Sequence, residues 1–487
     1  MSRRDPLHVP LWELWSLAAL CCFLLLASLP SGELTSDPAN LVGPLWLAAT
    51  LLLGAASRLR RTSAALWTGL FWMRVSTAVY FGLGSVATRV MNEESLAELS
   101  AFFEAAPAQL GKLNLLAAFA SLAVLLTVRL AAFIWPKAPS DRSEDDGRML
   151  LATGFLFGLI GYPVKYWIVL PLELGLFGEA VLPGMVGQLV WLAAIALFLL
   201  AFWAARHAPK VLPWLVLLAA LDAFAGILRF SKTDALLPLM MFALGWLQHR
   251  ASWPRIVLAA LTIVAAFHLI QPLAGYGRAQ LTDRYDTLRA AGLAERWAIF
   301  GDFLRDGPGE RDAALQSSLM RIAYNVSAAP AIAAYDAGMP GDSLQAIPYV
   351  FVPRFLWPEK PSFDMGRDYT IMVSGLETSS TWMGYFAESY WNLGWAGVPL
   401  VMVPFGLILF AGGRYAGWVI ENGQWLHFPG VFLGMWMGVR TDGVVATDIV
   451  AGAWLMLVHF PIAWAGSRLL EGMLHSRRDA GLSAVPA

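Results

Sequence analysis

Apolar runs of about twenty residues recur along most of this chain. The hydrocarbon core of a bilayer is about 30 Å thick, so a helix needs about twenty mostly apolar residues to cross it. Lipid offers no partner for backbone N–H and C=O groups, and a helix satisfies them internally. The succession of runs therefore predicts an all-α polytopic membrane protein.

The composition agrees with this fold class. Hydrophobic residues fill 58% of the 487 positions and charged residues only 14%, against roughly 25% charged residues in soluble domains. The net charge of -1 argues against a nucleic-acid partner, which would require a basic face. The sequence shows no zinc-type histidine cluster and no nucleotide-binding loop, so we expect no metal and no cofactor.

The apolar runs predict about twelve transmembrane helices. We place them at residues 11–30, 41–57, 64–86, 113–135, 149–163, 184–205, 211–228, 234–248, 255–274, 393–412, 426–439 and 449–467. The first run follows Arg3 and Arg4 and exceeds the apolar core of a signal peptide, so we expect it to remain as a span.

The loops fix the expected orientation, because cytoplasmic loops are enriched in Lys and Arg. With a cytoplasmic N-terminus, every cytoplasmic turn is basic, from Arg58 after the second span to Arg414 after the tenth. The C-terminal tail adds Arg468 and Arg477. We therefore expect both ends of the chain in the cytoplasm.

One loop is long enough to form a small extramembrane domain. We divide the chain into spans 1–9 (residues 1–274), a non-cytoplasmic loop domain (275–392), and spans 10–12 with the tail (393–487). Within the loop we expect an amphipathic helix at 288–304 and a second helix at about 313–336. Four prolines within residues 347–361 predict an extended path there instead of a helix.

Basic residues at the predicted outer face are the first candidates for a binding site. Arg229 and Lys232 lie with Asp234 on the tight turn after the seventh span, against the usual charge bias. The alternative for them is snorkelling to outer headgroups. The long loop and the last outer turn add further cations at Arg278, Arg284, Arg321, Arg354, Lys360 and Arg440.

The proline-rich stretch and an aromatic segment around Glu388 suggest which ligands these cations bind. Arg354 and Lys360 lie in the proline-rich stretch, whose rigid path would position them for an anion, although a plain surface loop is the alternative. Glu388 stands among aromatic residues that include Tyr385 and Trp391. Aromatic rings stack on sugars, and a carboxylate there could act as a general base or form a structural ion pair.

These motifs together resemble a known family. A Ser-Lys-Thr turn opens a span, and a long loop contains IPYVFVPRFLWPEKP followed by GYFAESYWNLGWAG. Over residues 215–410 this order is similar to Wzy-type O-antigen and oligosaccharide repeat-unit polymerases of bacterial inner membranes. In the turn, Lys232 stands where many relatives have arginine, so a point charge replaces a bidentate fork.

The resemblance implies transfer of a growing glycan from undecaprenyl pyrophosphate to the next lipid-linked repeat, on the periplasmic face. Lys232, Arg321 and Arg354 then match the family's basic residues, and Glu388 matches its acidic residue. The implied partners are the lipid-linked oligosaccharide and the bilayer and, by analogy, a chain-length regulator and a flippase. The pyrophosphate bond supplies the driving force, so no cofactor is implied.

Two other functions stay open from the sequence. An O-antigen ligase uses the same lipid donor on the same membrane side, and no motif here identifies the acceptor. A secondary transporter or lipid flippase could also have twelve spans. Transporters usually place their site near mid-membrane between symmetric halves, whereas these charges gather on one face and no repeat is visible.

Overall fold

The chain is helical throughout the part that the structure, a computed structural model, describes, and no strand occurs there. The described residues are 5–28, 38–103, 107–136, 147–176, 184–249, 252–284, 291–306, 311–352, 356–357, 359–360, 364–375 and 380–482. The prediction of an all-α fold is confirmed for these residues.

Nine helical stretches in the described ranges are long and apolar enough to cross a membrane. They are Leu11–Ser28, Ala39–Leu59, Ala108–Ile134, Arg148–Glu173, Val186–His207, Pro209–Leu228, Trp253–Leu281, Gly384–Glu421 and Val445–Leu470. Each coincides with a predicted span, which confirms a multi-pass membrane protein by length and composition.

The other three predicted spans fall on helices that do not reach this standard. The segment 64–86 is broken at Thr68, whose backbone is extended and whose hydroxyl accepts the Phe71 N–H to begin a new helix. The helix over 234–248 carries Lys232 and Asp234 in its first turn. The helix over 426–439 has only 12 residues. The total of twelve spans therefore stays a prediction.

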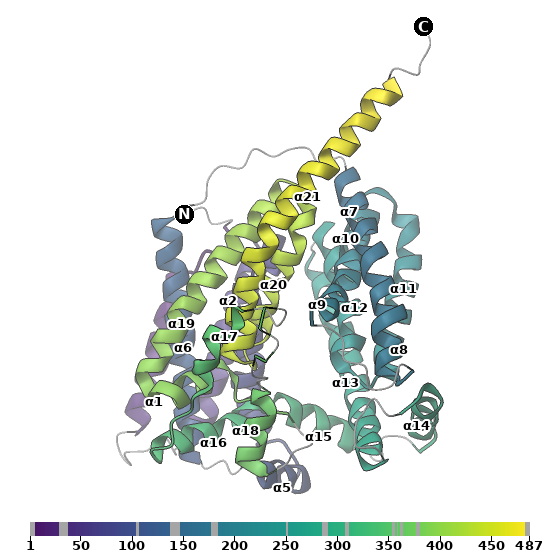
Figure 1. Ribbon diagram of the computed structural model, residues 1–487. Helices are drawn as coiled ribbons and strands as arrows, with labels where there is room; N and C mark the ends of the chain where they lie inside the picture. Colours follow the sequence, from purple (N-terminus) through teal and green to yellow (C-terminus); the bar gives the residue numbers. More distant parts are fainter. Residues whose placement is uncertain are drawn as a thin grey trace. The chain divides into compact units, whose positions relative to one another are not determined.

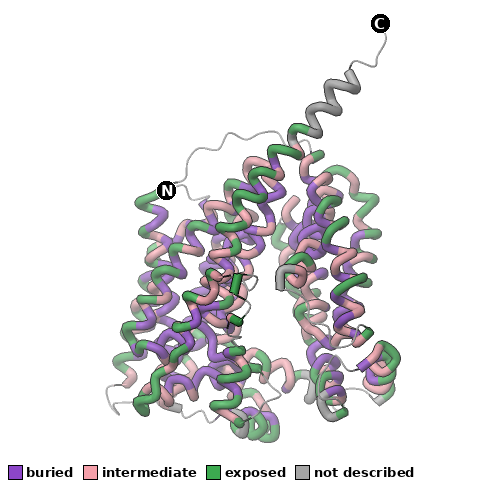
Figure 2. Tube along the Cα trace, in the orientation of Figure 1, coloured by how far each residue is buried: buried purple, intermediate pink, exposed green. Residues whose placement is uncertain are grey.

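The outward faces of the long helices are apolar. On α1 (Leu11–Ser28), Leu14, Leu17 and Leu24 are buried, whereas Trp15 and Leu26 are more than 60% exposed. Figure 2 shows this alternation of buried and exposed residues along the helices of both units. In a soluble protein the exposed face would be polar, so these surfaces are suited to contact lipid.

The chain forms two compact units. Unit 1 comprises residues 1–139, 316–417 and 431–456; unit 2 comprises 140–315, 418–430 and 457–487. The predicted loop segment 275–392 is thus divided, because its residues up to 315 belong to unit 2 and those from 316 to unit 1.

Unit 1 is built around α1, α6 and α2, with α16 packed on α6. Helices α5, α16 and α18 gather at one end of these long helices (Figure 1). Its helices are α1, α2 (Gly43–Leu59), α3 (Gly69–Thr77), α4 (Gly84–Ala87), α5 (Glu93–Phe102), α6 (Pro107–Ile134), α16 (Tyr324–Asp336), α17 (Ile347–Val350) and α18 (Met365–Ser374), with parts of α15 (Arg311–Ile322), α19 (Gly384–Glu421), α20 (Phe428–Val439) and α21 (Ala451–Leu482).

In unit 2, α10 packs against both α7 and α12, and α11 packs against α12. Its helices are α7 (Arg148–Pro163), α8 (Leu170–Glu173), α9 (Gly184–Leu189), α10 (Trp191–His207), α11 (Leu212–Leu228), α12 (Lys232–His249), α13 (Trp253–Arg284) and α14 (Leu293–Asp306). A π-helical segment, Val164–Val169, joins α7 to α8.

Several predicted boundaries in the loop segment are wrong. Helix α13 continues to Arg284 instead of ending at 274, and the expected helix 313–336 is broken at Ala323. The break lies where the Ile322 carbonyl meets Gly84 so closely that no side chain fits. Residues 347–350 form a helical turn, because a proline in the first turn of a helix loses no internal hydrogen bond.

The tenth predicted span begins earlier than expected and is kinked. Helix α19 starts at Gly384, not at residue 393, and its backbone is interrupted at Gly394, with φ 61° and ψ -149°. A side chain there would strike the hydroxyl of Tyr335. Glycine is therefore required at this position both for its conformation and for space.

Candidate functional site

A basic turn, residues Arg229–Lys232, connects α11 to α12 in unit 2. Phe230 has φ 52°, the one positive φ of a non-glycine residue among the described residues, in a region that bulky side chains rarely adopt. The Ser231 N–H donates to the Gly226 carbonyl at 3.0 Å and closes the end of α11. The Ser231 hydroxyl accepts the Asp234 N–H at 3.4 Å and caps the start of α12. These bonds make the turn short.

Helix α13 holds the strained residue in place. The Phe230 ring is only 1% exposed and lies directly over Gly277, where a methyl group would collide with it. Arg278 Nε donates to the Phe230 carbonyl at 3.0 Å. A left-handed non-glycine residue costs on the order of 1–3 kcal/mol, and such strain persists only where the surroundings fix it. Such fixed strain often occurs at functional sites.

Several cations and carboxylates surround the basic turn. Arg229 pairs with Glu173 and, at 3.2 Å, with Asp234. Arg296 of α14 is 3% exposed and donates to the carbonyls of Glu173 at 3.2 Å and Leu228 at 3.4 Å. Burial, together with the nearby Arg229, lowers the pKa of Arg296. The basic turn is therefore part of a cluster of interacting cations and carboxylates.

Arg296 was not among the predicted residues. It precedes Trp297 within the predicted amphipathic helix 288–304. Its guanidinium donates hydrogen bonds to backbone carbonyls at the ends of α8 and α11. A cation flanked by the apolar residues Leu293, Trp297 and Ile299 was the available signal.

A second group of charges, the Arg321–Arg440 cluster, belongs to unit 1. Arg321 in the last turn of α15 and Arg440 after α20 both approach Asp442, at 4.0 and 3.3 Å. Arg440 also lies 4.0 Å from Asp448. The Asp442 side chain is 6% exposed, whereas those of Arg321 and Arg440 are 42% and 38% exposed. The buried carboxylate therefore anchors two arginines that still face solvent.

Tyrosine side chains complete this cluster. The Arg321 guanidinium lies 5.4 Å from the centre of the Tyr324 ring, and its Nη1 donates to the phenol oxygen at 3.5 Å. Tyr324 raises the pKa of Arg321 against the effect of burial, and Asp442 raises it further. Arg321 therefore stays charged at any physiological pH.

The structure gives Glu388 a different place from the predicted one. Its side chain is fully buried. Oε1 accepts from Ser343 Oγ at 2.8 Å, and Oε2 accepts from Trp382 Nε1 at 2.9 Å and the Val445 N–H at 2.8 Å. These neutral donors occupy both oxygens, so neither the open general base nor the ion pair fits the geometry. Glu388 instead ties α19 to the segments around Ser343 and Val445.

The predicted sugar-stacking aromatic residues are also packed. Tyr385 is fully buried, with its ring 5.5 Å from that of Phe405, so its assignment to a substrate surface is wrong. Trp391 is half-buried against Gly341 and lies 6.1 Å from the Tyr369 ring. The aromatic residues of this segment pack between helices. The sequence alone did not distinguish such packing from aromatic residues at the membrane–water interface.

The remaining predicted residues are scattered. Lys360 Nζ donates to the Val352 carbonyl at 3.0 Å, and the exposed Arg284 bonds Gln280 at 2.8 Å. Arg354 lies outside the described residues. Unit 2 contains Lys232, Arg229, Arg278 and Arg284, whereas unit 1 contains Arg321, Glu388, Lys360, Tyr385, Trp391 and Arg440. Each unit therefore contains one group of cations, the basic turn in unit 2 and the Arg321–Arg440 cluster in unit 1.

The sequence analysis did not identify an ion pair between two membrane-length helical stretches of unit 2, Arg148–Glu173 and Pro209–Leu228. Lys165 Nζ lies 2.5 Å from Asp222 Oδ1, and their side chains are 8% and 0% exposed. The Tyr166 hydroxyl donates to the same oxygen at 2.7 Å, while Asp222 Oδ2 has no hydrogen-bond partner. A lone charge inside each of two apolar runs was the available signal.

Comparison with protein-family models, curated proteins and solved structures finds no match to this chain. The described residues include no group of three His, Cys, Asp or Glu side chains placed to hold a metal ion. The functional argument therefore rests on the two cation groups and their geometry.

The packing of Phe230 predicts opposite effects for two neighbouring glycines of α13. Gly277→Ala should lower the melting temperature of the purified protein in detergent, because the new methyl collides with the Phe230 ring at a cost of about 1–3 kcal/mol. Gly275→Ala is the matched control, since no atom lies within 4 Å of its added methyl, and alanine favours a helix by up to about 1 kcal/mol. Equal melting temperatures for the two variants would contradict the packing.

Proposed function

We propose that this protein is a membrane glycosyltransferase that joins lipid-linked oligosaccharide repeats into a polysaccharide, as the resemblance to Wzy-type polymerases suggests. The observation that carries the proposal is the basic turn of unit 2, where a strained backbone holds several cations close together. Cations held in fixed positions are suited to a pyrophosphate, the charged part of such a donor.

The basic turn offers several kinds of donor to a phosphate. Lys232 opens α12, so its ammonium adds to the positive end of the helix dipole. Arg229 and Arg278 present guanidinium groups, and each is already oriented by a bond to a carboxylate or a carbonyl. Such pre-oriented donors stabilise charge that develops on a leaving group without further rearrangement.

The reaction needs no group beyond these. An acceptor hydroxyl oxygen attacks the anomeric carbon of the donor sugar, and the bond from that carbon to the pyrophosphate oxygen breaks. The pyrophosphate leaves with the electron pair, and a phosphate oxygen or water takes the hydroxyl proton. In this scheme Glu388 is a positioning residue, because its oxygens are occupied by Ser343, Trp382 and Val445.

The Arg321–Arg440 cluster supports a second anion contact. Each transfer involves two lipid pyrophosphates, one on the donor and one on the acceptor. The arginines of this cluster pair with Asp442 and Asp448. We assign the donor pyrophosphate to the basic turn.

The proposal includes location and partners. The Lys- and Arg-rich loops expected in the cytoplasm predict that both chain ends lie in the cytoplasm of a bacterium. The same orientation places the α11–α12 turn on the periplasmic side of the inner membrane. A chain-length regulator and a flippase would act on the same lipid-linked substrate. The product can be an O-antigen, a capsule or an exopolysaccharide.

Two rival functions make different predictions. A ligase shares the donor and would differ only in the acceptor. A transporter or flippase is favoured by one observation, the buried Lys165–Asp222 pair, because ionisable residues within spans often mark a transport path. The pair links the same helical segments as Arg229 and Glu173, and we therefore interpret it as structural support for the turn.

The proposed function predicts the glycan profile of cells. Lys232→Ala and Arg321→Ala should each shorten or abolish the polysaccharide ladder on a gel, because a lost charge-assisted contact to phosphate costs about 1.5–3 kcal/mol. Arg305→Ala is the matched control: its side chain is 75% exposed and pairs with the neighbouring Asp302, so its ladder should be normal. Membrane levels of all variants are compared by immunoblot.

Other profiles would contradict the polymerase. Long polymer that stays attached to undecaprenyl pyrophosphate in cells lacking the protein indicates a ligase. An unchanged profile on deletion indicates transport or another role.

Orientation predicts a labelling pattern at the two ends of α11. In a background with Cys21 and Cys22 replaced by serine, Thr233→Cys should react with a membrane-impermeant maleimide added to spheroplasts, and Lys210→Cys should react only after lysis. Both positions are exposed, so access depends on membrane side alone. The reverse pattern would place the basic turn in the cytoplasm and exclude a periplasmic polymerase.

A further inference from the structure

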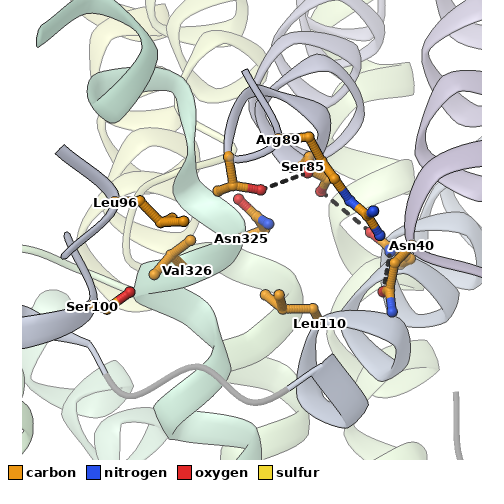
Figure 3. Close-up of a pocket in the computed structure, with 10 residues that line it drawn as sticks. Asn40, Ser85, Arg89, Leu96, Ser100, Leu110, Asn325 and Val326 are labelled. Atoms are coloured by element: carbon orange, nitrogen blue, oxygen red, sulfur yellow. Dashed lines mark hydrogen bonds between the residues drawn. The ribbon is translucent and has the colours of Figure 1, made fainter. Parts of the chain in front are cut away.

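Unit 1 contains a cavity of about 260 Å³ that the proposed mechanism does not use. It lies between α4, α5, α6 and the first turn of α16 (Figure 3). One wall is polar, with Asn40, Asn114 and Asn325. The sequence analysis assigned no role to any of these asparagines.

The polar wall is organised by its own hydrogen bonds. Asn114 Nδ2 donates to the Ala39 carbonyl at 3.2 Å and to Asn40 Oδ1 at 3.4 Å. Ser85 Oγ donates to the Phe81 carbonyl at 2.8 Å and lies 3.2 Å from Asn114 Oδ1 (Figure 3). The side chains are therefore oriented before any ligand arrives, which lowers the entropic cost of binding.

Asn325 has an unmet bonding requirement. Its side chain is 1% exposed, lines the cavity, and has no hydrogen-bond partner for Oδ1. In Figure 3 its amide points toward the cavity, opposite Asn40 and Arg89. A buried acceptor without a partner is costly and rare in folded proteins. A ligand that donates a hydrogen bond here would remove that cost.

The chemistry of the lining narrows the ligand class. A phosphate or carboxylate has no proton for Asn325 Oδ1, and an ammonium group would be repelled by Arg89. Adjacent hydroxyl groups both donate and accept, so they can bond Asn325 and Arg89 together. The apolar side chains of Leu96, Leu110 and Val326 are available to the C–H face of a ring.

The size of the cavity fits one sugar. A cavity of about 260 Å³ has room for several waters and therefore for a ligand the size of one sugar. We infer that this cavity binds one neutral hexose residue through adjacent hydroxyl groups. The inference rests on the proposed function in one respect: it takes the bound hexose to be part of the lipid-linked glycan.

The first turn of α16 contacts both the cavity and the Arg321–Arg440 cluster. Asn325 follows Tyr324 in α16, and Tyr324 contacts both Arg321 and, with ring centres 5.2 Å apart, Tyr80. A sugar held by Asn325 would therefore lie next to Tyr324, the residue of α16 that contacts Arg321. This arrangement suits a glycan whose sugar and pyrophosphate are recognised by the same unit.

Saturation-transfer NMR tests the inference on the full-length protein in detergent. The probes are the methyl glycosides of glucose, galactose, mannose and N-acetylglucosamine, with glucuronic acid as the charged comparison. We expect a signal from at least one neutral glycoside and roughly tenfold weaker binding in Asn325→Leu, which keeps the shape and removes the amide. Leu110→Trp fills the cavity from α6 and should abolish the signal.

The control is Asn422→Leu, which removes an asparagine whose amide bonds the Trp418 carbonyl outside the cavity and should bind like wild type. Thermal unfolding verifies that each variant is folded. No neutral glycoside signal, equal binding by a folded Asn325→Leu or Leu110→Trp variant, or preference for glucuronic acid would overturn the inference. Failure of the proposed function is distinguishable from failure of this inference. If cells lacking the protein have an unchanged glycan profile while the purified protein still shows Asn325-dependent sugar binding, the polymerase is rejected and the sugar site is retained.

Discussion

The packing of Phe230 on Gly277 is the contact on which the candidate donor site depends. It holds a bulky residue in a left-handed conformation, and the Arg278 bond to its carbonyl fixes the same peptide. The short turn that results places Arg229 and Lys232 at the adjoining ends of two helices. Without that contact the strain would be released and the cations would separate.

Pairing of buried charge is the second constraint, because apolar surroundings make a lone ion costly. In unit 1, Arg74 bonds Glu13 through two nitrogens, at 2.6 and 2.8 Å, with both side chains at most 1% exposed. In unit 2, Lys165 pairs with Asp222. These pairs join helices that lipid alone would not hold together, since hydrocarbon gives apolar helices no reason to associate.

The sequence predicted the parts of the fold that follow from hydrophobic length. All nine helical stretches of the described residues that are long and apolar enough to cross a membrane overlap predicted spans, and Lys232, predicted on the turn before a span, is the first residue of α12. The environment of single polar residues was not predictable. Glu388 and Tyr385 lie in a mixed polar and aromatic run that reads equally as an interface or as a packed core, and only tertiary contacts decide. The bonds of Arg296 depend on helices distant in sequence, which periodicity does not reveal.

The measurement that tests the central claim most directly is polymerisation by the purified protein in liposomes. The substrate is a synthetic oligosaccharide repeat on a polyprenyl pyrophosphate, supplied without nucleotide and with a metal chelator present. The account predicts glycans of several repeats, with one polyprenyl pyrophosphate released for each bond formed, as measured by mass spectrometry. Movement of the intact lipid across the bilayer without any new glycosidic bond would contradict the account and identify a transporter.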